Sequence, residues 1–149
     1  MAVKERKRRG GDGWLGATVS HQGFPMALRV RSKIHTAETR ARFQRLAAIT
    51  HRLAEVRANG LPKSRYNDGL AQLDADVIRA LESEDGAVVV IVETFAGKRT
   101  YYAYADGPGR AKAALARLRE AYPQHDLTAA GGPDPDWGLY SEYRERWPW

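Results

Sequence analysis

The feature that most restricts the fold is the longest apolar run, residues 87–92, with the sequence AVVVIV. This run is far shorter than the roughly 18 residues that a membrane-spanning helix needs, and its β-branched side chains favour a buried strand. A turn at Ala96-Gly97-Lys98 follows, and the alternating residues 99–105 (RTYYAYA) are typical of a second strand. The sequence therefore predicts a hairpin of strands 87–95 and 99–105.

The second strand of this hairpin carries a mixture of aromatic and basic side chains. Alternation divides them between two faces, Thr100, Tyr102 and Tyr104 on one and Arg99, Tyr101 and Ala103 on the other. We expect Tyr102 and Tyr104 to pack under helices and Arg99 and Tyr101 to lie on the outer face. Exposed aromatic residues flanked by arginine on a sheet stack RNA bases in some domains. Arg99 and Tyr101 are therefore candidate contacts with a partner or a nucleic acid.

Further strands and helices are indicated on both sides of this hairpin. Residues 14–20 and 25–32 alternate around a His21-Gln22-Gly23 turn, which predicts an N-terminal hairpin. Helical spacing of apolar residues predicts one helix around residues 70–81 and another around residues 111–122, and a short strand follows at 125–130. These periodicities place the chain in the α+β class.

Residues 36–57 fit two interpretations. Their content of Ala, Arg, Glu and Leu and an apolar stripe at helical spacing favour a helix. Residues 46–53 also alternate in the manner of a strand. Local propensity favours the helix.

Most of the net charge of +6 belongs to the first residues of the chain. Five basic residues against Glu5 contribute +4 before Gly10: Lys4, Arg6, Lys7, Arg8 and Arg9. We therefore expect a basic, disordered arm at residues 1–12 and a single, nearly neutral α+β domain at residues 13–149. A short basic arm of this kind can also engage phosphate groups, which makes Arg6, Lys7, Arg8 and Arg9 candidate nucleic-acid contacts.

Composition and motifs point away from catalysis and cofactor binding. The chain has no cysteine, which excludes thiolate nucleophiles and cysteine zinc sites and fits a reducing, cytoplasmic compartment. The four histidines lack metal-ligand spacing, and Asp74 and Asp76 are expected to be solvated. A literal G-x-G-x-x-G match at residues 11–16 precedes a strand instead of following one. We expect no catalytic, cofactor or metal residues.

The C-terminal segment combines a helix signal with aromatic residues. Asp134 is a candidate N-cap, Pro135 suits the first helical position, and Trp137 is expected to pack against the domain. Trp147 and Trp149 lie beyond this short helix. We expect them to be exposed and to offer contacts to a partner.

Four stretches carry a family resemblance: GFPMALRVR at residues 23–31, NGLP at 59–62, AGKRTYYAYAD at 96–106 and DPDWGLYSEY at 134–143. Together they resemble the bacterial DUF695 family, a domain of unknown function. The resemblance implies a strand at residues 45–56, and it suggests kinship with ribonuclease E inhibitor B-type regulators. The implied fold is a ferredoxin-like βαββαβ sandwich with an extra N-terminal hairpin and a short C-terminal helix. The resemblance supplies no catalytic residues.

These observations favour a non-catalytic binding or regulatory module. We expect its sheet face or terminal aromatic helix to dock a protein partner. The alternative is a domain that contacts RNA or DNA through the Arg99 and Tyr101 face and the basic arm. No enzyme activity and no membrane association are expected.

Overall fold

The computed structural model describes residues 13–34, 36–147 and 149. In this part of the chain, strands and helices follow one another in a fixed order: β1 (Trp14–His21), β2 (Phe24–Arg31), α1 (Ala37–Arg42), β3 (Arg45–Arg52), α2 (Ser64–Asp68), α3 (Ala71–Leu81), a 3-10 turn η1 (Ser83–Asp85), β4 (Ala87–Phe95), β5 (Lys98–Ala105), α4 (Arg110–Ala121), β6 (Asp126–Pro133) and α5 (Gly138–Arg146). The fold is therefore mixed, as the periodicities predicted.

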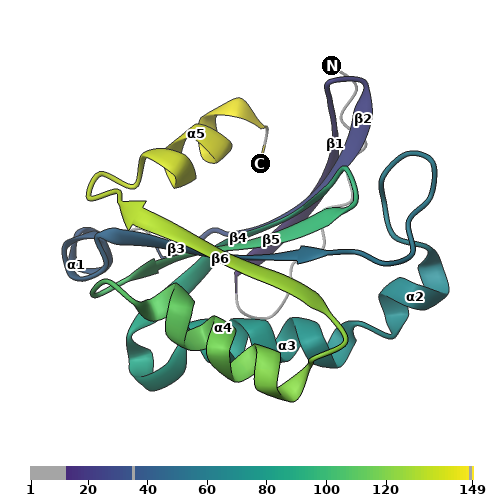
Figure 1. Cartoon of the computed structure of the whole chain (residues 1–149). Helices are drawn as coiled ribbons and strands as arrows, with labels where there is room; N and C mark the ends of the chain where they lie inside the picture. Colours follow the sequence, from purple (N-terminus) through teal and green to yellow (C-terminus); the bar gives the residue numbers. More distant parts are fainter. Residues whose placement is uncertain (1–12, 35, 148) are drawn as a thin grey trace.

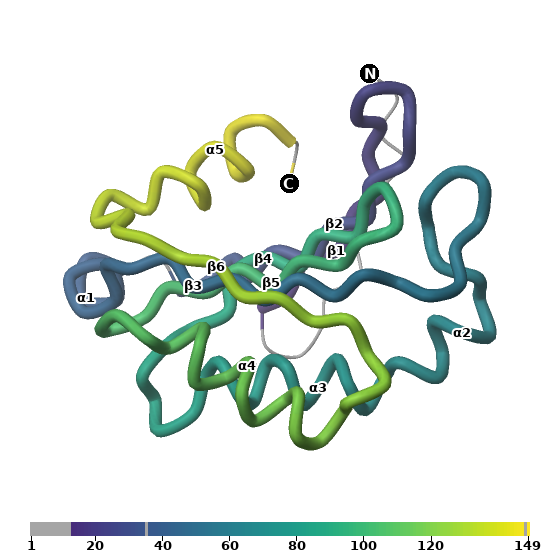
Figure 2. Tube along the Cα trace, viewed as in Figure 1, coloured from purple at the N-terminus to yellow at the C-terminus, as the bar shows by residue number. Residues whose placement is uncertain are grey.

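The strands form one six-stranded sheet in the order β1-β2-β4-β5-β3-β6, and every neighbouring pair is antiparallel. Helices α3 and α4 lie side by side across one face of this sheet, and α5 crosses the opposite face (Figures 1 and 2). Strands β1 and β6 form the two edges. No described helix combines the length and apolar character that crossing a membrane requires.

Both faces of the sheet are packed, so the core has two sides. Helix α3 buries Leu73, Val77 and Leu81 and α4 buries Ala114 and Leu118 against the first face. These residues recur at helical spacing, which is why each helix turns a single apolar stripe to the sheet.

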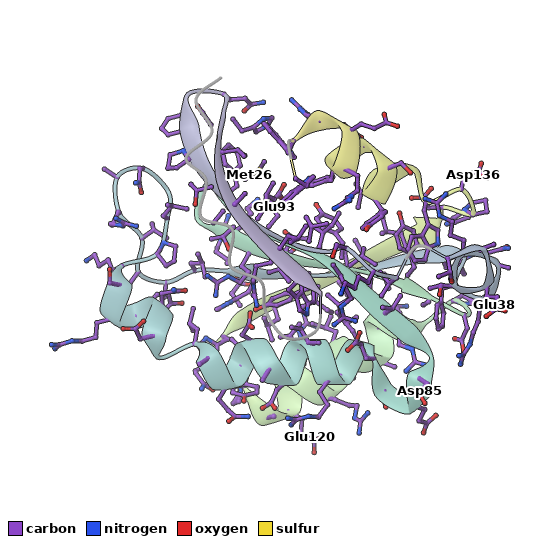
Figure 3. The ribbon with its side chains drawn as sticks, turned by 180° about the vertical axis from the view of Figure 1, so that it is seen from behind. Met26, Glu38, Asp85, Glu93, Glu120 and Asp136 are labelled. Atoms are coloured by element: carbon purple, nitrogen blue, oxygen red, sulfur yellow. The ribbon has the colours of Figure 1, made fainter. Side chains whose placement is uncertain are left out.

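The opposite face is covered by aromatic residues from the C-terminal segment. The Trp137 ring stacks on Tyr104 with ring centroids 4.3 Å apart. Tyr143 donates a hydrogen bond of 2.6 Å to Glu93 of β4, and Met26 of β2 packs in one cluster with Trp147. Figure 3 shows Met26 and Glu93 from behind the molecule.

The ambiguous segment at residues 36–57 contains both a helix and a strand. Helix α1 ends at Arg42, and β3 begins at Arg45. The resemblance correctly implied the strand, although it ends at Arg52 and not at Val56, and local helix propensity was wrong for it. Strand β3 pairs with β5 on one side and β6 on the other. Two complete ladders outweigh the small helix preference of Ala, Arg and Leu.

Both predicted hairpins, the two central helices and the last strand are confirmed with end shifts of a few residues. The start of the terminal helix differs from the prediction. The N-cap position is occupied by Trp137 and not by Asp134, although the Asp134 carboxylate accepts hydrogen bonds from the N–H groups of Gly138 (2.8 Å) and Leu139 (3.1 Å). Pro135, however, lies before the helix, which starts at Gly138 after Trp137 adopts a left-handed backbone with φ of 54°.

Candidate functional site

The most polar part of the core lies on the α3 and α4 face of the sheet, beneath the junction of α2 and α3. Sheet register brings Thr94 of β4, Arg99 of β5 and His51 of β3 into one row across the strands. The neighbouring row contains Arg29 of β2 and Tyr101 of β5, with Val92 between them. Polar side chains from four strands therefore gather in one region.

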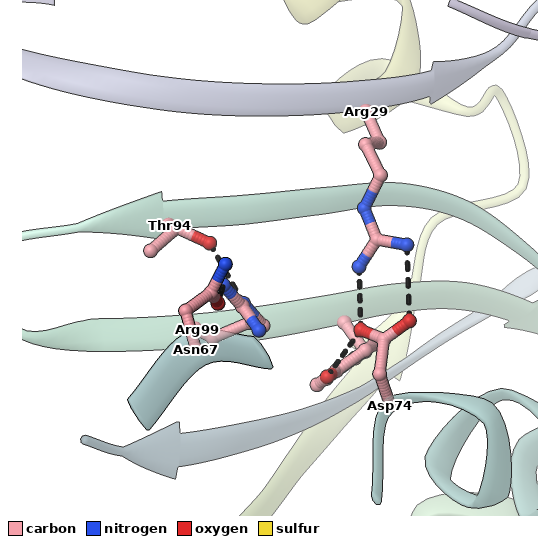
Figure 4. A network of polar contacts seen from close by, with 6 residues as sticks. Arg29, Asn67, Asp74, Thr94 and Arg99 are labelled. Atoms are coloured by element: carbon pink, nitrogen blue, oxygen red, sulfur yellow. Dashed lines mark hydrogen bonds and ion pairs between the residues drawn. The ribbon is translucent and has the colours of Figure 1, made fainter. Parts of the chain in front are cut away.

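The first group of contacts, the Asp74 cluster, consists of Arg29, Asp74 and Tyr101. The Arg29 guanidinium donates two hydrogen bonds to the Asp74 carboxylate, of 3.0 and 2.5 Å, and the Tyr101 hydroxyl donates a third of 2.7 Å. Figure 4 shows the two contacts between Arg29 and Asp74 in close view. The arrangement is bidentate, so it fixes the plane of the guanidinium as well as its position.

The second group, the Arg99 cluster, consists of Arg99, Thr94 and Asn67. Arg99 donates from Nε to the Thr94 hydroxyl (2.9 Å) and from a terminal nitrogen to the Asn67 side-chain oxygen (2.7 Å) (Figure 4). Asn67 belongs to α2, whereas Thr94 belongs to β4. Arg99 therefore links α2 to the sheet.

Charge and burial fix the protonation of the Asp74 cluster. Burial alone raises the pKa of Asp74, but the hydrogen bond and positive charge of Arg29 and the Tyr101 hydrogen bond outweigh it, so the pKa is lowered. Burial, followed by the charge of Asp74, raises the pKa of Tyr101. Asp74 consequently stays ionised and Tyr101 stays protonated at neutral pH.

A groove of about 390 Å³ opens between the two clusters. It is lined by Arg29, Asn67, Asp68, Leu70, Ala71, Asp74 and Arg99. The Arg29 side chain keeps 40% of its surface exposed although its guanidinium is held by Asp74. The groove is thus lined by an ordered, partly exposed arginine side chain.

His51 extends the polar row into the interior. It is 1% exposed, and neither of its ring nitrogens has a hydrogen-bond partner among the described residues. Its ring meets His125 edge-on, with centroids 5.0 Å apart. Burial, together with the charges of His125 and Arg99, lowers the pKa of His51 to about 4. His51 is therefore neutral at physiological pH.

The structure corrects the predicted position of Tyr101. Tyr101 is 1% exposed and packs toward α3, so it does not lie on an outer face. Alternation correctly placed Tyr101 on one face and Tyr102 and Tyr104 on the other. Helices α3 and α4, however, cover the face that carries Tyr101, and not the face that carries Tyr102 and Tyr104. Tyr104 instead packs against Trp137, and Arg99 is half-buried.

The predicted exposure of the C-terminal tryptophans is wrong for Trp147. Trp147 is 3% exposed because it covers Val19, Met26 and Leu28 of the β1–β2 hairpin. Trp149 is half-buried, and its indole N–H donates to the Tyr143 carbonyl at 3.2 Å. The candidate residues Arg6, Lys7, Arg8 and Arg9 and the proposed arm at residues 1–12 lie outside the described residues.

Sequence reasoning missed Arg29 and assigned Asp74 and Asp76 to solvent. Asp74 is bonded as described above, and Asp76 accepts hydrogen bonds from Gln72 (3.0 Å), Arg79 (2.9 Å) and the Tyr122 hydroxyl. One signal was available for Asp74, which follows Leu70 by four residues and precedes Val77 by three. A charged residue on the apolar stripe of a helix requires a partner within the core.

The side chains of this site can form hydrogen bonds and ion pairs with a ligand. Among the described residues, no group of three or more His, Cys, Asp or Glu side chains could hold a metal ion. Asp74 already accepts three hydrogen bonds, which leaves little of its capacity for proton abstraction.

The model of a family described as "Family of unknown function (DUF695)" matches residues 12–143. No curated protein and no solved structure matches the chain.

Proposed function

The chain belongs to the DUF695 family, as its sequence motifs indicated, and from this premise we propose that it is a non-catalytic binding or regulatory module that docks a protein partner. The proposed contact is the groove between the Asp74 and Arg99 clusters. The observation that carries this proposal is the state of Arg29, which is fixed by two hydrogen bonds and yet keeps 40% of its side-chain surface exposed beside the groove.

A fixed and partly exposed arginine side chain suits the recognition of a carboxylate. Within the described residues, Arg29 uses two of its five N–H groups on Asp74, so further donors remain for a ligand. Because Asp74 holds the side chain in place, a partner binds without the full entropic cost of ordering a free arginine. Arginine is also enriched among the residues that dominate protein interfaces. We therefore propose an acidic side chain of the partner as the group bound here.

Two features of the site support binding over catalysis. The pKa of Asp74 is lowered, whereas a general base at neutral pH needs a pKa near that pH. The sheet register places the His51 imidazole beside Arg99 of the groove, and His51 is 1% exposed. Neither group combines a suitable pKa with access to a ligand.

The alternative of an RNA or DNA contact has weaker support. Base stacking needs an exposed aromatic ring, and Tyr101 is buried. The proposed groove carries Asp68 and Asp74 beside its two arginines, so it can pair with a single carboxylate but lacks the extended positive surface that a chain of phosphates requires.

The finer fold assignment and the regulatory kinship also remain proposals. From β3 to β6 the elements run strand, helix, strand, strand, helix, strand, with strand neighbours β4-β5-β3-β6. This order supports a ferredoxin-like core to which β1 and β2 are added beside β4. Kinship with ribonuclease E inhibitor B-type regulators and a cytoplasmic location remain predictions from the sequence.

Site-directed photo-crosslinking in cells of the native host tests the docking proposal. A photoreactive amino acid at the exposed Asp68, on the groove, is compared with one at the exposed Glu120 on α4. We expect a discrete crosslinked protein from position 68 only, and its loss in the double variant Arg29→Gln/Asp74→Asn, which removes both charges together. Thermal melts check that this variant is folded.

Two outcomes would contradict the proposal. Equal crosslinking from positions 68 and 120 would show that the groove is not the contact. A crosslinked species that nuclease removes, and whose yield falls steeply with salt, would favour the nucleic-acid alternative.

A further inference from the structure

Strand β1 lies at one edge of the sheet, and within the described residues it pairs with β2 alone. The hairpin turn establishes which of its backbone groups point outward. Gln22 and Gly23 have φ of 52° and 81°, which defines a two-residue turn closed by a hydrogen-bonded pair of His21 and Phe24.

From this pair onward, hydrogen-bonded and non-hydrogen-bonded pairs alternate along an antiparallel ladder. A bond of 2.8 Å from the Ser32 N–H to the Gly13 carbonyl fits this alternation at the far end of the hairpin. The remaining residues of β1 direct their N–H and C=O groups away from β2: Trp14, Gly16, Thr18 and Ser20.

The two edges of the sheet differ in how they resist further pairing. Strand β6 begins with Asp126 and ends with Pro133, and the Arg119 side chain donates a hydrogen bond of 3.0 Å to the Leu127 carbonyl. Charges, proline and covering side chains are the usual means by which edge strands avoid pairing with other chains. Strand β1, with the sequence WLGATVSH, has eight residues and contains no Lys, Arg, Asp, Glu or Pro.

We propose that β1 pairs antiparallel with β1 of a second copy of this chain, about a two-fold axis that passes at Ala17. This register places the four outward residues of each copy opposite one another, Trp14 with Ser20 and Gly16 with Thr18. Each such pair exchanges two backbone hydrogen bonds. The two sheets then form one continuous sheet across the dimer.

Side-chain pairing in this register favours a second copy as the occupant. On the face toward α5, Leu15 lies opposite Val19 of the partner subunit and Ala17 lies opposite its own equivalent, so the facing residues are apolar. On the other face Gly16 and Thr18 meet, and both are small. A two-fold axis brings equivalent residues together, and the uncharged strand avoids like-charge contacts there.

The oligomeric state in solution is the first test. One chain has a mass of 16.6 kDa, and light scattering after gel filtration should give twice that value. Thr18→Lys, on the exposed edge position of β1, should remove the dimer because it brings two like charges close to the axis. Thr128→Lys is the matched control, since Thr128 is also exposed on an edge strand. It should leave the dimer intact.

A single cysteine gives a test of the register. The chain has no native cysteine, so Ala17→Cys introduces one thiol at the proposed axis. A non-hydrogen-bonded antiparallel pair has Cα atoms about 4.5 Å apart, which lies within the range that a disulfide bridges. Mild oxidation should convert Ala17→Cys to a covalent dimer, and Thr128→Cys should remain monomeric on denaturing gels.

A monomeric wild-type protein at high concentration would overturn the proposal. Dissociation by Thr128→Lys with an intact Thr18→Lys dimer would overturn it as well. Loss of the dimer on deleting residues 1–12 would show that those residues, and not the β1 edge, form the interface. The crosslinking test of the groove uses positions 68 and 120, which lie on α2 and α4 and not on β1. A failure of the dimer proposal can therefore be distinguished from a failure of the docking proposal.

Discussion

Replacement of His51 by leucine tests the consequence of burying an imidazole without hydrogen bonds. At pH 7 the buried ring is neutral, and two polar nitrogens lack partners among the described residues. An unsatisfied buried polar group costs about 1–3 kcal/mol, and an apolar side chain of similar volume removes that cost. We therefore expect His51→Leu to be at least as stable as the wild type at pH 7.

The difference between the two proteins should grow as the pH falls. The pKa of His51 is about 4 in the folded protein against 6.5 for the free side chain, so the unfolded state binds more protons between these values. Stability therefore decreases as pH falls through this window. The complete shift corresponds to about 3 kcal/mol, and at pH 5 it contributes about 2 kcal/mol.

Urea unfolding of both proteins at pH 7 and pH 5 measures how the difference in their free energies of unfolding changes with pH. The pKa values of Asp74 and Asp134 are lowered from 3.8, so their stabilising contributions are lost only below about pH 4 and affect both proteins equally. His125→Gln serves as the control. This variant removes the effect of His125 on the pKa of His51 but keeps the buried His51 ring. Its free energy of unfolding should therefore retain most of the wild-type dependence on pH.

Parallel stability curves for wild type and His51→Leu between pH 7 and pH 5 would refute the reasoning. They would show that the His51 ring becomes protonated in the folded state, through access to water. Arg99, His125 and Asp126 are the charged or titratable groups that act on the ring. Of these, Asp126 alone favours the charged form.

Three further substitutions give expected losses that denaturant unfolding can measure. Tyr101→Phe removes a buried hydrogen bond to an ionised group and should cost about 2 kcal/mol; a neutral result would show that Asp74 is satisfied without it. Asp134→Ala removes the hydrogen bonds from the N–H groups of Gly138 and Leu139 and the 2.7 Å bond from Tyr104, for a loss of about 1–2 kcal/mol; Asp136→Ala, next to it, should change little. Trp147→Ala should cost about 3 kcal/mol, like other buried aromatic residues, and a loss below about 1 kcal/mol would restore the prediction of an exposed end.

Strand positions could be predicted from the sequence wherever side-chain pattern and turn chemistry agree. The β-branched run at 87–92 and the turn at Ala96-Gly97 define β4 and β5 within one residue. Strand β3 required the family resemblance, because its residues favour a helix and only their pairing with β5 and β6 makes them a strand. Local sequence contains no information about ladders formed with residues about 50 and 80 positions away.

The candidate site could not be predicted for a related reason. Arg29 and Asp74 are 45 residues apart and Asp74 and Tyr101 are 27 apart. Alternation along β2 and β5 shows which residues share a face, but not which face α3 and α4 cover. Once that choice is known, Asp74 on the apolar stripe of α3 must lie above β2 and β5, and Arg29 and Tyr101 become its natural partners.

The two incorrect predictions of exposure have one physical cause. Tyr101 and Trp147 were expected at the surface because no covering element was evident for the face or the chain end that carries them. A sheet packed on both faces provides a buried position for each, under α3 and over the β1–β2 hairpin respectively. The aromatic residues are thereby used for stability. In both of our proposals, recognition depends on groups that packing leaves partly exposed, namely the Arg29 side chain at the groove and the outward backbone of β1.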